Sequence, residues 1–237
     1  MSICQKIKAE LNQYINPEKA SFYPRFFKTG AGEYGEGDVF IGVTVPHQRK
    51  VARKYYQEIS LKELGTLLKD PIHEYRMTAL LILVEKYAQA REEEKHKELV
   101  DFYLKHLPFV NNWDLVDASA DKILGSYLLH KDKKILYDLA RSQELWKQRT
   151  AIIATFYFIK NNSFQDTLAL AKIFLDHPHD LIHKAVGWML REVGKRDFVT
   201  AVDFLTDHYQ DMPRTMLRYA IEKFEPELRQ RFLKGLI

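Results

Sequence analysis

Apolar residues recur along this chain at helical spacing. Between positions 75 and 87 the apolar positions include 75, 77, 79, 80, 81, 83, 84 and 87. This density fits a largely buried helix better than a helix with a single apolar face. Further helical runs cover 92–107, 131–140, 163–175 and 197–209. The pattern therefore predicts an all-α fold.

Residues that commonly begin helices mark further boundaries. The run from Ser60 to Glu63 is a capping box, in which each side chain can accept the other residue's backbone N–H. Asn16 followed by proline predicts a helix that ends near Lys28, and Pro46 opens another helix. Asp70, also followed by proline, predicts the start of the largely buried helix.

Residues 30–45 interrupt the helical pattern. Glycines at 30, 32, 35 and 37 favour turns, and the β-branched run from 39 to 45 favours a short extended segment. We expect a glycine-rich loop or a small hairpin inserted between two helices. The segment lacks the arrangement of a phosphate-binding loop, and its acidic residues would repel phosphate.

Alanines at 79, 118, 151, 185 and 220 repeat at spacings of 39, 33, 34 and 35 residues. A helical run lies between each pair of successive alanines, so each period holds two helices. Such a period is typical of an α-solenoid. Because the tetratricopeptide consensus is absent, we expect a single HEAT-like repeat domain over residues 1–237. In such a stack the second helices of successive pairs line one concave surface.

Composition narrows the class of protein. The apolar fraction of 46% allows a sizeable core, and only 10 glycines and 8 prolines argue against an all-β fold. Cys4 is the single cysteine, which excludes an internal disulfide and suits a reducing cytoplasm. No stretch is long enough to span a bilayer, so no membrane partner is expected. The net charge of +4 permits nucleic-acid binding without requiring it.

Three carboxylates follow Trp113 at helical spacing. Asp114, Asp117 and Asp121 stand at i, i+3 and i+7, which stacks them along a helix. Like charges at this spacing cost about 0.2–0.5 kcal/mol per pair, so a cation is expected from elsewhere in the fold. Arg149, one repeat after Asp117, is a candidate, although a plain ion pair between repeats would use the same two residues. An aromatic face beside a carboxylate suits a planar cationic ligand.

Basic and aromatic residues precede the register alanines where a core would carry leucine or isoleucine. A curved surface of this kind suits the phosphate backbone of a duplex, although a solvated helix face also carries Lys and Arg. Trp188, in an apolar helix, could point into the core or onto the concave face. Gly187 beside it allows the close approach of a neighbouring helix or a ligand.

The histidines around Pro178 indicate a helix start more than a metal site. His179 and His183 stand four residues apart, as metal ligands can, but His177 and Asp180 flank a proline where capping explains them. We therefore expect no metal and no cofactor. Cys4 has no histidine or asparagine partner in its sequence context, which argues against nucleophilic catalysis by this thiol.

Five blocks of the sequence resemble the AlkD-like family of bacterial DNA alkylation repair proteins. They read NPEKA at 16–20, RFFK at 25–28, WDLVD at 113–117, WKQRTA at 146–151 and KAVGWMLRE at 184–192. They occur in order over nearly the whole chain. The resemblance implies a HEAT-like superhelix that wraps duplex DNA and excises cationic alkylpurines such as N3-methyladenine and N7-methylguanine. It also implies a bacterial cytoplasmic protein, associated with the nucleoid when bound to DNA, and we expect it to act as a monomer.

The resemblance also assigns roles to residues. Asp117 takes the place of the family's catalytic carboxylate, and Arg149 that of an arginine in the same cleft. Trp113 and Trp188 correspond to two tryptophans that contact the lesion nucleotide. The residues expected to contact DNA are Lys28, Arg25, Phe26, Arg76, Lys147, Lys184, Arg191 and Arg218.

Two departures from the family pattern keep alternatives open. Phe26 stands where the family's glycosylase carries a tyrosine, so one hydrogen bond is lost. The segment 30–38 is an insertion relative to that glycosylase, and some relatives with an inserted hairpin bind branched DNA with little or no excision. A non-catalytic binder of branched or damaged DNA is therefore the second hypothesis, and a HEAT-like protein scaffold is the third.

Overall fold

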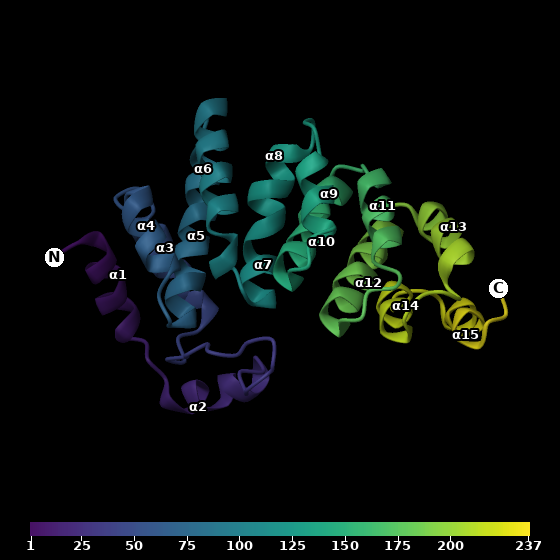
Figure 1. Ribbon diagram of the computed structural model, residues 1–237, viewed down its shortest axis with the longest axis horizontal. Coiled ribbons are helices and arrows are strands. Elements are labelled where there is room, and N and C mark those ends of the chain that lie inside the picture. The colour runs from purple at the N-terminus through teal and green to yellow at the C-terminus, as the bar shows by residue number, and fades with distance from the viewer. The chain divides into compact units, whose positions relative to one another are not determined.

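The regular elements of the chain are all helical (Figure 1), in a computed structural model that describes residues 1–237. The chain forms two compact units, Met1–Ile123 and Leu124–Ile237. The first unit holds α1 (Ile3–Asn12), α2 (Pro17–Phe26), α3 (Val45–Tyr55), α4 (Leu61–Leu68), α5 (His73–Gln89), α6 (Glu93–Lys105), the 3-10 turn η1 (Leu107–Phe109) and α7 (Trp113–Ala120). The second holds α8 (Ser126–Leu128), α9 (Lys134–Ala140), α10 (Leu145–Lys160), α11 (Gln165–Ile173), α12 (Asp180–Gly194), α13 (Phe198–His208), α14 (Arg214–Ala220) and α15 (Pro226–Lys234). A π-helical segment, η2 (Asp121–Gly125), follows α7. The all-α prediction is confirmed.

Within each unit the helices pack in the order expected of paired repeats. In the first unit α5 packs against α3 and α7, with α4 and α6 also beside it. In the second unit α12 packs against α10 and α14, and α9, α11 and α13 each lie beside one of these helices. Second helices of successive pairs thus contact one another, which is a HEAT-like arrangement. That the whole chain forms one domain stays a prediction.

The register alanines all lie on the second helices of these pairs. Ala79, Ala151, Ala185 and Ala220 are buried, whereas Ala118 of α7 is half-buried. A small side chain at these positions lets neighbouring helices approach closely. The repeat seen in the sequence therefore reflects helix packing at four of its five positions.

The helix start signals were correct with one exception. Ser60 and Glu63 form the predicted capping box at α4, and the Asn16 side chain caps α2 by accepting the Lys19 N–H at 3.0 Å. The buried helix α5 begins at His73, not at the predicted Asp70–Pro71. Asp70 Oδ1 instead accepts the Ile72 N–H at 2.9 Å, and Ile72 is extended.

Residues 30–37 form consecutive bends and turns, a stretch without helix follows as far as Thr44, and Val45 already begins α3, so no hairpin forms here. That this segment is an insertion stays a prediction. The chain's one isolated β-bridge joins Val39 to Ile72 in parallel, which holds the segment to the start of α5 rather than to a strand of its own. Gly42 has φ +80°, and a Cβ at this position would lie 2.1 Å from the Asn16 carbonyl oxygen. The buried Glu74 carboxylate accepts the Gly42 N–H at 2.7 Å.

None of these helices combines the length and the apolar composition that crossing a lipid bilayer requires.

Candidate functional site

Trp113 is the first residue of α7 and lies against two phenylalanines at the end of α2. Its ring stacks on Phe27 with centroids 5.3 Å apart and meets Phe26 edge-on at 5.9 Å. The Asn112 side chain accepts the Trp113 N–H at 2.8 Å and so caps the helix. Asp117 stands one helical turn after Trp113, so both side chains belong to one face of α7. The structure therefore brings Phe26 to Trp113 and places Asp117 on the same helix face.

His73, the first residue of α5, is a buried bridge between two carboxylates. Its Nδ1 lies 2.9 Å from Asp38 Oδ2, and its Nε2 lies 2.8 Å from Asp114 Oδ2. Burial alone would lower the pKa of His73, but the Asp114 and Asp38 carboxylates raise it to about 9. At neutral pH the ring is therefore an imidazolium that donates from both nitrogens. This bond pair ties the glycine-rich loop, through Asp38, to the first turn of α7.

Asp38 holds the centre of this buried network. The Arg76 guanidinium donates to its Oδ1, and Asn112 Nδ2 donates to its Oδ2 at 3.1 Å. Burial alone would raise the pKa of Asp38, but the His73 hydrogen bond and the Arg76 charge hold it below its ordinary value. Two carboxylates thus face two cations, His73 and Arg76, which compensates the cost of burying charge.

The burial of Arg76 changes its expected role. The sequence placed this arginine among the DNA contacts, but the structure buries it at 5% exposure. Its Nη1 also donates to the Asp70 and Pro71 carbonyl oxygens at 3.0 and 3.1 Å. Because its Nη1 and Nη2 donate to protein acceptors in the interior, Arg76 supports Asp38 and offers no surface cation to a phosphate.

Two of the three aspartates in the acidic row, Asp114 on α7 and Asp121 on η2, are paired with cations. The His73 imidazolium is hydrogen-bonded to Asp114, and Lys122 Nζ lies 3.1 Å from Asp121 Oδ1. Both carboxylates are therefore compensated within the first unit. The pairing of Asp117 with Arg149 stays a prediction.

Sequence reasoning missed His73 and Asp38, although one signal was present. His73, Glu74 and Arg76 open a helix whose later residues are almost all apolar and buried. Ionisable residues on a helix that is buried all round need buried partners, since an unpaired charge in the interior is very costly. The signal indicates that a network exists, but not which distant residues complete it.

Trp188 lies in the middle of α12 and is half-buried, so part of its indole reaches the surface. Its Nε1–H donates to Glu192 Oε1 at 3.2 Å, and its ring lies 5.5 Å from that of Phe156. Lys195 Nζ donates to the same Glu192 oxygen at 2.7 Å, and the Arg196 guanidinium lies 3.9 Å from the other. The indole is thus held by a buried carboxylate whose cationic partners, which also include Arg191 at 3.9 Å, are only partly exposed.

Gly187, beside this tryptophan, marks the approach of a neighbouring helix. A Cβ at this position would lie 2.4 Å from the Met216 carbonyl oxygen and 2.5 Å from the Tyr219 Cβ, both on α14. Any larger residue would push α14 away from α12. Of the two explanations that the sequence left open, the neighbouring helix is the one that the structure supports.

Arg149 is buried on α10 and reaches the start of α12. Its Nη1 donates to the Leu181 carbonyl oxygen at 2.6 Å. Since α12 also carries Trp188, this bond fixes the two helices that hold both predicted site residues of the second unit. Arg149 is therefore a buried, oriented guanidinium rather than an exposed surface cation.

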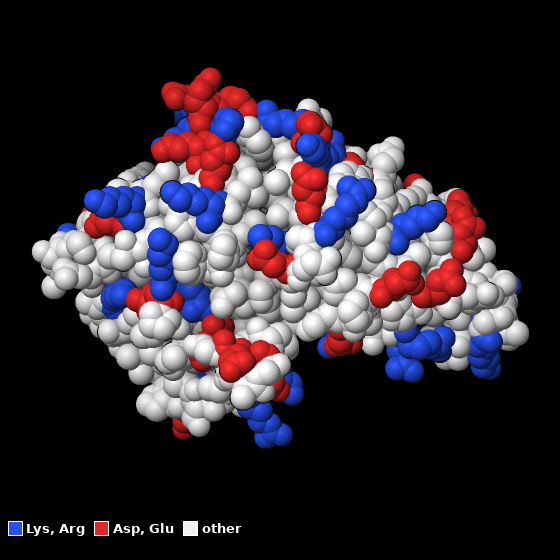
Figure 2. Space-filling model, viewed as in Figure 1, with Lys and Arg blue, Asp and Glu red and all other residues white.

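The other predicted DNA-contacting cations keep exposed surface. Arg25, Lys28 and Arg218 are exposed, and Lys147, Lys184 and Arg191 are half-buried. The three half-buried residues form ion pairs with Glu144, Asp180 and Glu222, respectively. Figure 2 shows that Lys and Arg are interspersed with Asp and Glu over the face in view.

The histidines near Pro178 have local hydrogen-bond partners. His179 caps α12 by accepting the Leu181 N–H at 3.1 Å. His177 Nε2 lies 2.9 Å from Gln148 Oε1, and His183 Nε2 contacts the His177 carbonyl oxygen. Capping and loop fixation therefore account for this cluster.

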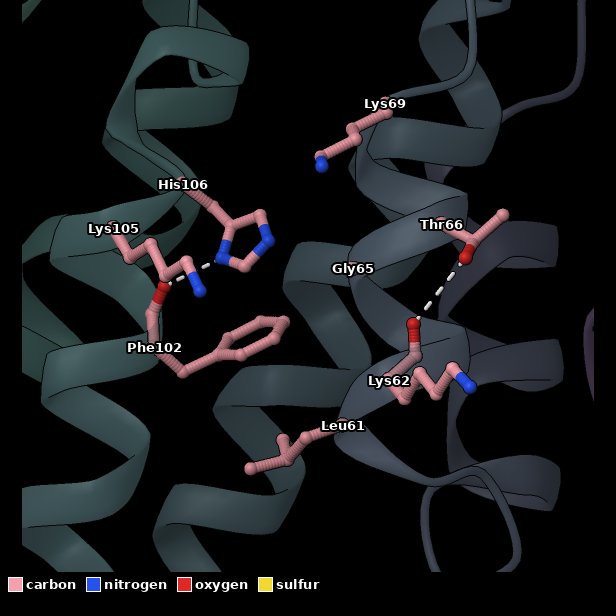
Figure 3. Close-up of a pocket in the computed structure, with 8 residues that line it drawn as sticks. All are labelled: Leu61, Lys62, Gly65, Thr66, Lys69, Phe102, Lys105 and His106. Atoms are coloured by element: carbon pink, nitrogen blue, oxygen red, sulfur yellow. Dashed lines mark hydrogen bonds between the residues drawn. The ribbon is translucent and has the colours of Figure 1, made fainter.

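A cleft of about 450 Å³ opens between α4 and α6 (Figure 3). It is lined by Leu61, Lys62, Gly65, Thr66, Lys69, Phe102, Lys105 and His106. None of the residues predicted as catalytic or DNA-binding lies in it, so the cleft is separate from the Trp113 region.

Comparisons with known proteins give a family and a fold. The family model described as "DNA alkylation repair enzyme" matches residues 7–224. Among solved structures, one described as "Predicted DNA alkylation repair enzyme from Enterococcus faecalis" superposes with a TM-score of 0.70 at 18% identity. The match covers 90% of this chain and 97% of that chain, and at this identity it concerns the fold. A comparison with curated proteins finds no match.

Proposed function

The chain belongs to the family of DNA alkylation repair enzymes, and we propose that it is a DNA glycosylase that removes cationic N3- and N7-alkylated purines from duplex DNA. The family match over residues 7–224 carries this proposal. The position of Trp113 and Asp117 on one face of α7 supports it, because an aromatic ring beside a carboxylate suits a cationic nucleotide.

The chemistry needs little more than electrostatic stabilisation. Alkylation at N3 or N7 gives the purine a positive charge and weakens its glycosidic bond. As the base departs, an oxocarbenium-like sugar develops, and a carboxylate held against it stabilises that charge and can orient water. We assign this role to Asp117. Trp113 and Trp188 would meet the cationic nucleotide through their faces, at about 0.5–2 kcal/mol each.

The buried network explains why the assignment falls on Asp117 rather than on its neighbour. Asp114 already accepts a hydrogen bond from the imidazolium of His73. Breaking that bond would leave a buried cation with one partner fewer, which is costly. Asp114 therefore serves the structure of the site, and the next carboxylate along the helix is the one that we assign to the reaction.

The cations with exposed surface would bind the phosphate backbone. Arg25 of the first unit would do so directly, and Lys28 would leave Glu33, whose Oε1 lies 3.9 Å from its Nζ. Lys147, Lys184 and Arg191 would exchange their acidic partners for phosphate oxygens, which is favourable because the ion pairs are at least partly exposed and worth little. Binding should weaken steeply with salt, since each phosphate contact releases counterions.

A second candidate function is binding of branched or damaged DNA without excision. Two observations favour it. Phe26 lacks the hydroxyl that the family's glycosylase carries at this place, and the ordered segment 30–45 is fixed beside α7 through Asp38. A loop held rigidly next to Trp113 could contact a DNA junction.

Release of N7-methylguanine from a duplex tests the proposal. Wild type and Asp117→Asn would be compared, with Asp138→Asn, an exposed acid of α9, as the matched control. We expect Asp117→Asn to lower the rate about 100- to 1000-fold while DNA binding is retained, and Asp138→Asn to behave as wild type. Binding lost together with excision would make Asp117 structural. Salt-sensitive binding with no release by any variant would favour the second candidate.

A further inference from the structure

Helix α2 presents two phenylalanine rings to solvent. Phe22 is 57% exposed and Phe26 is 49% exposed. Their rings lie 5.9 Å apart with an interplanar angle of 29°, so they form a stacked pair. No residue of α2 is buried. Exposing two aromatic rings to water is unfavourable, and packing in the core does not explain their presence on this helix.

Other contacts hold α2 in place. Its N-terminus is fixed by the backbone approach of Gly42 to Asn16, whose N–H also donates to the Ile41 carbonyl oxygen at 3.1 Å. In its middle, the Tyr23 ring meets Phe40 edge-on at 5.7 Å. Phe22 takes part in none of these contacts, so the fold does not require an aromatic ring there.

The exposed pair adjoins the tryptophan that we assign to the lesion. Phe26 stacks with Phe22 and meets Trp113 edge-on at 5.9 Å. Arg25 and Lys28, both exposed, lie at the same end of α2. Figure 2 shows that the surface over α2 is mostly uncharged. The aromatic pair thus adjoins Trp113 through Phe26, and two cations stand at the same end of the helix.

We propose that Phe22 and Phe26 form a stacking platform for an unpaired nucleobase of bound DNA. The inference rests on the proposed function, because it takes DNA as the ligand. Bases stack on aromatic side chains whatever their sequence, and nearby cations bind the adjoining phosphates. Two rings are too small for a protein interface, which buries about 800 Å² on each partner.

The test compares two labelled duplexes that differ by one extra, unpaired 2-aminopurine in one strand. Fluorescence anisotropy gives the affinity for each duplex, and 2-aminopurine emission reports stacking at the unpaired base. The variants are Phe22→Ala, Phe22→Leu and Phe22→Trp. Phe198→Ala is the matched control, since Phe198 is 48% exposed on α13.

We expect Phe22→Ala and Phe22→Leu to weaken binding of the bulged duplex at least fivefold, leaving the perfect duplex unchanged. Leucine keeps apolar area but has no π-face, whereas Phe22→Trp should retain affinity and quench 2-aminopurine as wild type does. The Phe198→Ala control should bind both duplexes normally.

Several results would overturn the platform. Equal losses on both duplexes would make Phe22 a general contact, and full affinity of Phe22→Leu would make it a merely apolar one. A dimer in wild type that Phe22→Ala dissolves would assign the pair to a second copy of the chain. Absence of salt-sensitive binding to the perfect duplex would instead count against the proposed function, so the two failures are distinguishable.

Discussion

The two tryptophans assigned to the lesion are held in different ways. Trp113 stacks on Phe27, and Phe27 in turn lies 5.2 Å from the ring of His73, the buried imidazolium between two carboxylates. Trp188 instead donates one hydrogen bond to Glu192, whose nearest cationic partners, Lys195 and Arg196, are partly exposed. A buried charge network is expensive to break, whereas ion pairs with exposed partners contribute little. We therefore expect a rigid support for Trp113 and a weak, salt-sensitive one for Trp188.

Removing the charge of His73 should have the largest effect on stability, because it disrupts the support of Trp113 and leaves that of Trp188 intact. In His73→Gln, Asp38 and Asp114 lose the imidazolium between them and are left under-compensated in the interior. We expect the free energy of unfolding to fall by about 3–5 kcal/mol, measured by urea denaturation. His130→Gln, at an exposed histidine, is the control and should change it by less than about 0.5 kcal/mol.

A second variant tests whether uncompensated charge causes the loss of stability in His73→Gln. In His73→Gln/Asp114→Asn one of the two uncompensated acids is removed, so part of the lost stability should return. A loss below about 1 kcal/mol in the single variant would mean that His73 does not carry the network.

The alkaline limb of the pH profile tests the same network in the wild-type protein. The pKa of His73 is raised from 6.5 to about 9 on folding. Between these values the folded state binds a proton that the unfolded state has released, so stability is complete below pH 6.5 and falls as pH rises through 9. The shift corresponds to about 3 kcal/mol.

Urea denaturation at several pH values from about 6 to 10 measures this loss, with His73→Gln in parallel. Other groups titrate in both proteins, so the difference between them isolates His73. We expect that difference to shrink as the pH approaches 10. A constant difference across the range would contradict a charged His73 in the folded state.

Most of the fold could be predicted from patterns in the sequence. The dense apolar run predicted α5 because helical periodicity depends on residues a few positions apart. The alanine period predicted the packing of second helices because a repeat of 33 to 39 residues is visible in the sequence itself. The start of α5 was misplaced, since the parallel bridge between Val39 and Ile72 keeps the preceding residues extended. That bridge joins segments 33 residues apart, and helical periodicity has no access to it.

The same limit explains the missed part of the candidate site. The sequence showed that the acids of α7 need a cation but not that His73 supplies it across 41 residues, or that Asp38 joins it across 35. It also took Arg76 for a surface cation, although burial and carbonyl acceptors engage its guanidinium. Residue type predicted charge, whereas only the packing decides whether a charge faces solvent.

The smallest expected effect lies at Trp188. Glu192→Gln keeps an oxygen that can accept the indole N–H but removes the negative charge facing Lys195 and Arg196. Because Lys195 and Arg196 are 44% and 30% exposed and Arg191 comes no closer than 3.9 Å, the free energy of unfolding should fall by only about 1 kcal/mol. At roughly 1 M salt, where screening reaches about 3 Å, that loss should vanish, whereas the deficit of His73→Gln should persist. Urea denaturation of both variants at low and high salt measures this. Equal salt-resistant losses would show that the two tryptophans have supports of the same kind.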